Sequence, residues 1–137
     1  MSIEEENKAV VKRAYEDLNQ KGLAAYYELV TPDHIVHLTE GDMSLEQDRQ
    51  FNTMFYEAFP DAKGTVEQMI AEGDRVAVRV TWRGTHTGKW MDIAPTGNKI
   101  DITNTAIFRI ADGKLAEIWA TTDTLRFMQQ IGIIPSR

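Results

Sequence analysis

The sequence predicts an α+β fold in which a cone-shaped, curved antiparallel sheet wraps around about three to four helices and encloses a pocket. Two observations predict it: helical periodicity dominates the first part of the chain, and strand alternation with hairpin turns dominates the second. A chain of 137 residues with 42% apolar residues suits one folded domain with one core. We therefore expect a single domain over residues 1–137.

The predicted helices carry clear start signals. Ser2 with Glu5, and Ser44 with Gln47, have the spacing of capping boxes, in which a side chain and a backbone amide satisfy each other. Apolar residues then recur with helical spacing. The predicted helices span residues 2–21, 23–30, 44–59 and 124–131.

The predicted strands follow an alternation of period two. Val76, Val78 and Val80 fall on one face of the longest strand, opposite Ala77 and Arg79. The sequence Asp-Gly at 112–113 is a strong hairpin signal between the last two strands. The predicted strands span residues 34–38, 65–71, 75–87, 99–110 and 114–122.

Composition excludes several functions. A net charge of −6 argues against nucleic acid and against an anionic membrane surface, because both need clustered cations. The absence of cysteine excludes disulfides and zinc–cysteine sites. No apolar run approaches the ~18 residues of a membrane span, and the acidic N-terminus differs from a secretory signal. We expect a cytoplasmic protein without metal or organic cofactor.

An ordered set of short motifs covers nearly the whole chain and resembles the SnoaL-like polyketide cyclases of the nuclear transport factor two-like superfamily. Each motif is weak alone, but their order is specific. They are residues 7–22, 32–37 (PDHIVH), 59–61 (FPD), 72–77 (EGDRVA), 83–88 (RGTHTG), 95–97 (PTG), 108–114 (FRIADGK) and 130–132 (QIG), with Trp119 and Asp123.

This resemblance implies a cone-shaped fold and ring closure of an aromatic polyketide ester by intramolecular aldol condensation, without a cofactor. It also implies that one aspartate acts as general acid and base, and Asp123 is the matching position. One departure is Ala106, where relatives often carry a polar residue that contacts the ligand. Relatives also associate, and the free outer face of strand 99–110 leads us to expect a homodimer.

Asp123 has two interpretations. A catalytic base that works beside a carbonyl needs a carboxylate whose pKa burial has raised. Asp123 also directly precedes the last predicted helix, where aspartate is a favoured N-cap and is usually solvated. The two roles are not exclusive, and the surroundings of the carboxylate discriminate between them.

The histidines divide by position. His34 and His37 lie three residues apart on one strand and therefore face opposite sides, so they cannot chelate one metal. His37 matches the histidine of the family, and we expect it to orient the substrate carbonyl or to share a proton with Asp123. A structural, hydrogen-bonded histidine is the alternative. His86 lies near a loop edge and fits the rim of the pocket or a turn.

The candidate ligand-binding residues are aromatic or polar side chains on predicted elements around the pocket. Trp119 fits either a cavity wall or the core. It shares strand parity with Glu117, which would be awkward if buried, and a bulge or twist that breaks this parity would resolve the conflict. Trp90 lies in a loop, where an apolar residue indicates a lid or an oligomer contact. The aromatic candidates on helices could equally be core residues, and Asn104 could equally face solvent. The candidates are Trp119, Asn104, Tyr15, Phe51, Phe55, His86 and Trp90.

Two functions therefore remain at this stage. The first is a cofactor-free cyclase or isomerase that acts on a hydrophobic, carbonyl-rich small molecule, with Asp123 as base and then acid. The second is a protein that binds such a ligand without transforming it, in which Asp123 only caps a helix. A buried Asp123 supports the enzyme, whereas a solvent-facing Asp123 bonded to helix amides supports the binding protein.

Overall fold

The computed structural model describes residues 1–135, which form four helices and six strands. The helices are α1 (Ile3–Lys21), α2 (Leu23–Tyr27), α3 (Leu45–Ala58) and α4 (Thr124–Gln130). The strands are β1 (Val30–Leu38), β2 (Gly41–Ser44), β3 (Lys63–Glu72), β4 (Arg75–Thr85), β5 (Lys99–Ala111) and β6 (Lys114–Thr122). This is the predicted α+β fold.

Both predicted capping serines begin helices, but only the capping box of Ser44 and Gln47 is complete. The Ser2 hydroxyl accepts the Glu5 amide at 3.1 Å at the start of α1. At α3, Ser44 accepts the Gln47 amide at 3.3 Å, and the Gln47 side chain accepts the Ser44 amide at 2.9 Å. The second predicted helix is shorter than expected and ends at Tyr27, because β1 already begins at Val30.

The six strands form one sheet in the order β2-β1-β6-β5-β4-β3. All neighbours are antiparallel except β1 and β6, which run parallel. The prediction of a wholly antiparallel sheet was therefore wrong at one pair, which joins the first and the last strand of the chain. Strand β2 was not predicted, because its four residues carry no alternation of apolar side chains.

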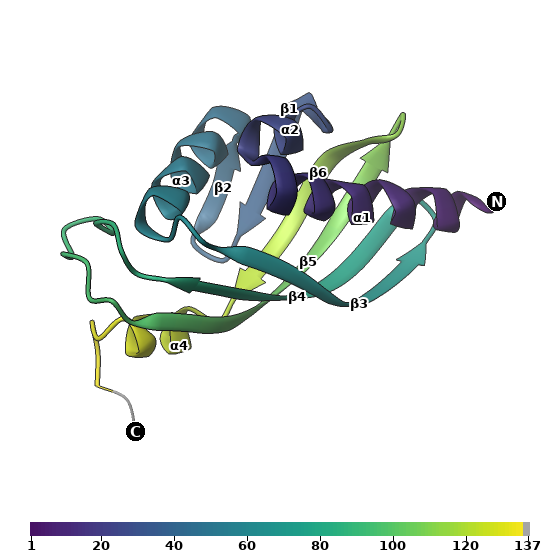
Figure 1. Cartoon of the computed structure of the whole chain (residues 1–137). Helices are drawn as coiled ribbons and strands as arrows, with labels where there is room; N and C mark the ends of the chain where they lie inside the picture. The colour runs from purple at the N-terminus through teal and green to yellow at the C-terminus, as the bar shows by residue number, and fades with distance from the viewer. Residues whose placement is uncertain (136–137) are drawn as a thin grey trace.

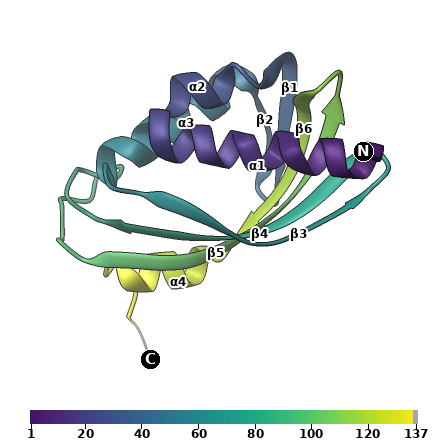
Figure 2. The same cartoon turned by 45° about the vertical axis from the view of Figure 1, so that its right-hand side comes forward.

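The sheet curves strongly around the helices but is not closed into a barrel. Figures 1 and 2 show α1, α2 and α3 on one side of it, with α1 lying across the strands. The end strands β2 and β3 do not pair with each other within residues 1–135. Helix α4 follows β6 and packs against the beginning of β5, where Arg126 and Gln130 both donate to the Asp101 carbonyl.

Alternation along the strands gives the sheet two different faces. The inner face, which α1–α3 cover, carries Val76, Val78 and Val80, and these are at most 2% exposed. The outer face carries their neighbours and remains open on the monomer. The predicted parity of this strand is confirmed.

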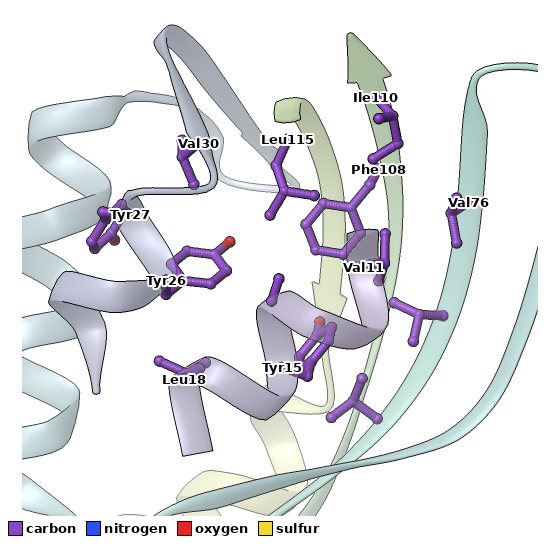
Figure 3. Close-up of a cluster of buried hydrophobic side chains, with 14 residues drawn as sticks. Val11, Tyr15, Leu18, Tyr26, Tyr27, Val30, Val76, Phe108, Ile110 and Leu115 are labelled. Atoms are coloured by element: carbon purple, nitrogen blue, oxygen red, sulfur yellow. The ribbon is translucent and has the colours of Figure 1, made fainter. Parts of the chain in front are cut away.

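Two clusters of apolar side chains form the core. In the larger cluster, residues of α1 and α2 pack on the inner face of β4, β5 and β6 (Figure 3). Tyr15 meets Phe108 there edge to face, with ring centroids 6.2 Å apart. The second cluster joins the end of α3 to the loop after β4 and to α4, through Phe59, Trp90 and Phe127. Among residues 1–135, no helix is both long and apolar enough to cross a membrane.

Candidate functional site

Three tyrosines from three helices place hydroxyl groups between the helices and the inner face. Tyr15 comes from α1, Tyr26 from α2 and Tyr56 from α3 (Figure 3 shows the first two). The Tyr56 hydroxyl is buried and has no hydrogen-bond partner among residues 1–135. Burial raises the pKa of all three phenols far above the ordinary value, so they stay protonated and able to donate at neutral pH.

A hydrogen-bonded carboxyl group, Asp48, comes from the same helix as Tyr56. Asp48 is 7% exposed, and its Oδ2 accepts the Tyr27 hydroxyl at 2.7 Å and the Asn52 amide at 3.3 Å. Asn52 also donates to the Tyr27 hydroxyl at 2.9 Å, so the three side chains close a triangle. Burial raises the pKa of the Asp48 carboxyl, and the hydrogen bond from Tyr27 partly offsets this rise.

The helical repeat of α3 explains why these polar groups share one side. Asp48, Asn52 and Tyr56 are spaced by four residues and therefore form one stripe on the helix. With a rise of about 1.5 Å per residue, Asp48 and Tyr56 lie about 12 Å apart along the axis. The stripe faces inward because Asp48 at its start is buried and Tyr56 packs against the main core cluster.

His34 adds a buried imidazole from β1. It is 2% exposed, and its Nδ1 lies 3.1 Å from the Leu115 carbonyl oxygen. Because a carbonyl only accepts, Nδ1 carries the hydrogen and Nε2 keeps a lone pair, which has no partner among the described residues. Burial lowers the pKa of His34, so the ring is neutral at pH 7.

The interior therefore combines apolar walls with unpaired polar atoms. Native proteins rarely leave buried polar groups without partners, because each one costs about 1–3 kcal/mol. Apolar walls with a few convergent donors and acceptors suit a hydrophobic ligand that carries oxygen atoms. Asn104, also on the inner face, has its amide engaged with the Thr122 hydroxyl at 2.8 Å.

An open groove lies on another part of the sheet and has a different character. Its volume is about 510 Å³, and it lies on the strands β3, β4 and β5, beside the Arg83–Asp101 ion pair. Its lining includes Lys63, Lys99 and Asp61, which are charged and solvated. Such a surface does not provide the dry enclosure that an apolar ligand requires.

Comparison with known proteins identifies the family. The SnoaL-like polyketide cyclase family matches residues 9–131 of the chain. The chain belongs to the SnoaL-like polyketide cyclase family. No curated protein matches it.

Solved structures of the family agree with this assignment. AclR from Streptomyces galilaeus, assigned as a hydroxylase, is 27% identical with a TM-score of 0.91, over 97% of this chain and 85% of that one. A SnoaL-like polyketide cyclase assigned in Jannaschia sp. CCS1 is 27% identical with a TM-score of 0.86, over 98% and 97%. IdmH from Streptomyces antibioticus, assigned as a polyketide cyclase, is 29% identical with a TM-score of 0.80, over 92% and 98%.

Asp123 lies where the second interpretation of the sequence placed it. It is exposed, and it is the N-cap of α4, with its Oδ1 accepting the Arg126 amide at 3.1 Å. The expected burial among apolar groups is absent, because the chain leaves the sheet at Thr122 and turns toward solvent. The position that a SnoaL-like resemblance links to catalysis is thus a solvated cap in this chain.

His37 lies on the outer face, away from the interior. Its Nε2 lies 2.5 Å from Glu117 and its Nδ1 lies 2.8 Å from Asp42. Because both carboxylates can only accept, both ring nitrogens donate and the imidazole is positively charged. The hydrogen bond to Glu117, followed by that to Asp42, raises the pKa of His37. The opposite orientation of His34 and His37 is confirmed, since His34 is buried and His37 bonds to carboxylates on the outer face.

Trp119 shares the outer face with His37. The two rings stack with centroids 5.2 Å apart, and the Arg75 guanidinium lies 4.7 Å from the indole centroid. Glu117, two residues earlier, points the same way and accepts from Arg109 at 2.9 Å. A bulge at Ala116 separates Glu117 and Trp119 from the buried Leu115 and breaks the parity of β6, so Glu117 and Trp119 both lie on the outer face.

The remaining candidates lie in or beside the second core cluster, with Phe51 at its exposed edge. Trp90 is 6% exposed and contacts Phe51, Phe55 and Phe127, so the loop folds its indole inward. His86 is fully buried rather than at the rim and stacks on Phe59. The backbone amide of Thr96 donates to His86 Nδ1 at 3.3 Å, which fixes the hydrogen on Nε2.

Sequence reasoning missed Asp48, Asn52 and Tyr27. The available signal was position: Asp48 lies three residues before Phe51 and seven before Phe55, so it falls on the apolar side of its helix. A carboxylate in that stripe must be paired or functional. The partner Tyr27 comes from another helix, and spacing along the chain does not reveal that contact.

The two histidines predict opposite effects of pH on the free energy of unfolding. His34, whose pKa is lowered, stays neutral in the fold while the unfolded chain takes up a proton, so its contribution falls as pH drops below its ordinary value of about 6.5. His37, whose pKa is raised, contributes below that value, and its contribution disappears as pH rises through the raised pKa.

Urea unfolding of the wild type, His34→Gln and His37→Gln between pH 5 and 8 tests this prediction. His34→Gln should remove a slope of up to about 1.4 kcal/mol per pH unit on the acid side. His37→Gln should instead weaken the protein most at low pH. Parallel pH profiles for the wild type and His34→Gln would contradict the neutral buried His34.

Proposed function

We propose that this SnoaL-like protein is a cofactor-free cyclase that closes a ring in a hydrophobic, carbonyl-rich small molecule by intramolecular aldol condensation. The observation that carries the proposal is the group of protonated phenols in the apolar interior, with the Tyr56 hydroxyl lacking any partner among residues 1–135. The apolar walls suit the body of the ligand, and the phenols suit its carbonyl oxygens.

The reaction needs only proton transfers. A base removes a proton from the carbon beside one carbonyl group, and the enolate oxygen carries the resulting charge. The enolate carbon then attacks a second carbonyl carbon, a carbon–carbon bond forms, and the alkoxide takes the proton back. Fixed phenol donors stabilise the developing oxyanion, and such donors contribute about 10²–10³ in rate.

The family resemblance assigns the proton transfer to Asp123. A capping carboxylate can still act as a base, because its cap uses one oxygen. The position of His37 on the outer face argues against the predicted assistance from this residue.

The alternative is a binding protein of the same fold, which holds such a ligand without converting it. The exposed, capping Asp123 favours this alternative. The fold itself does not decide, because SnoaL-like structures host different assigned activities.

The Tyr56 hydroxyl provides the test. An aromatic polyketide ester with an enolisable ketone side chain, incubated with protein and EDTA but no cofactor, should give a ring-closed product of unchanged mass by chromatography and mass spectrometry. Tyr56→Phe should lower kcat/KM by about tenfold or more. It should leave stability unchanged or higher, because an unpaired buried hydroxyl is removed.

Thr53→Ala, on the exposed side of the same helix, is the matched control and should behave as wild type. Binding of the ester without any ring closure would replace the cyclase proposal by the binding-protein alternative.

The outer face further supports a homodimer. Ile35 and Ile107 are 42% and 41% exposed beside the half-buried Trp119, and a second copy would cover them. Sedimentation at micromolar concentration should give twice the chain mass of 15.6 kDa. Ile107→Glu should shift the protein toward monomer, whereas Ile3→Glu on α1 should not. A wild-type mass of one chain would contradict the dimer.

A further inference from the structure

We infer that Asp48, held by Tyr27 and Asn52, is the group that exchanges the proton with the ligand inside the cone. This inference rests on the proposed function, because it names a base for that reaction. It assigns the proton transfer to the buried carboxyl group instead of the exposed Asp123.

The geometry leaves one oxygen of Asp48 free. Both hydrogen bonds that the carboxyl accepts fall on Oδ2, from Tyr27 and Asn52. Within residues 1–135, Oδ1 has no hydrogen-bond or ion-pair partner, although the side chain is 7% exposed. Tyr27 and Asn52 fix the orientation of the carboxyl, and Oδ1 is the atom that can accept a proton from a ligand carbon.

The surroundings make this carboxyl able to change its charge. Asp48 forms no ion pair among residues 1–135, and the Arg49 guanidinium lies over the Tyr27 ring, 4.7 Å from its centroid. Burial without an ion pair raises the pKa of Asp48 toward the working range of a general base. The charge of Asp48 also contributes to the raised pKa of the Tyr26 phenol, after burial and Tyr15.

A purely structural role explains less. The triangle joins α2 to α3, but an uncharged acceptor would join them as well. A buried carboxylate without a cation is costly, and such groups are retained where they are used. Asp48 therefore combines a fixed orientation, a free oxygen and a tunable charge in one place.

The chemical step is balanced within the site. The ionised Asp48 takes the proton from the carbon beside the ligand carbonyl, and the phenols receive the negative charge on the enolate oxygen. After the new carbon–carbon bond forms, the protonated Asp48 returns this proton to the alkoxide. No oxidant, reductant or other reactant is needed.

Deuterium exchange into 2-acetylnaphthalene tests the proton transfer without requiring ring closure. In D₂O, the wild-type protein should accelerate the loss of the methyl proton signal in NMR spectra. Asp48→Asn should lower this acceleration by about 10²-fold or more. Glu57→Gln, an exposed carboxyl group on the same helix, is the matched control and should stay within about twofold of wild type. Asp123→Asn, which keeps the helix cap, tests which of the two carboxyl groups transfers the proton.

Tyr27→Phe provides a measurement that would not change if Asp48 had only a structural role. It removes the hydrogen bond that favours the ionised carboxyl, so the rise of the exchange rate with pH should shift to higher pH while the plateau is kept. If thermal melting shows that Asp48→Asn is unfolded, the pH shift of the exchange rate in Tyr27→Phe still tests the role of Asp48.

Three results would overturn the inference: full exchange in a folded Asp48→Asn, loss of exchange in Asp123→Asn instead, or no exchange by the wild type. Ring closure of the polyketide ester is measured separately. A wild type that closes the ring but fails these exchange tests would refute the role of Asp48 and leave the proposed function intact.

Discussion

The alternation of side chains along β4, β5 and β6 is the constraint on which the rest of the structure depends. One face of these strands meets α1–α3 and buries valine, alanine and phenylalanine side chains, whereas the other face carries arginine, threonine and glutamate. A shift of one residue would exchange the two sets. The same alternation sends His34 inward and His37 outward, and it therefore decides which histidine belongs to the interior.

The interior is stable as a core but chemically unusual for one. Helices α1, α2 and α3 each contribute a tyrosine, and α3 also contributes a buried carboxyl group. Replacing an unpaired polar group with an apolar one of similar shape is close to neutral or stabilising. The retained phenols and the retained Asp48 thus lower the stability that the cone could reach, and a ligand that pairs with them would recover part of this loss. The side chains that limit the stability of the fold are therefore the ones that we propose contact the ligand.

Much of this fold could be predicted from local signals. The serine N-caps of two helices, the Asp-Gly hairpin and the parity of the valine-rich strand act over a few residues, and the structure confirms them. The parallel pairing of β1 with β6 could not be predicted, because it joins residues about 80 positions apart in the chain. The same limit hid the contact between Asp48 and Tyr27. The family resemblance indicated the correct fold, but it could not show that Asp123 lies in solvent, since burial depends on where the chain leaves the sheet.

We propose that the ligand binds between α1–α3 and the inner face of the sheet. A crystal structure of the complex with 1,8-dihydroxyanthraquinone, a flat aromatic that carries carbonyl and phenol oxygens, provides the test. The rings should lie in this interior, with an oxygen within hydrogen-bonding distance of the Tyr56 or Tyr26 hydroxyl. Density for the compound on the outer face beside Trp119, or in the open groove beside Arg83, with the interior unchanged, would contradict it.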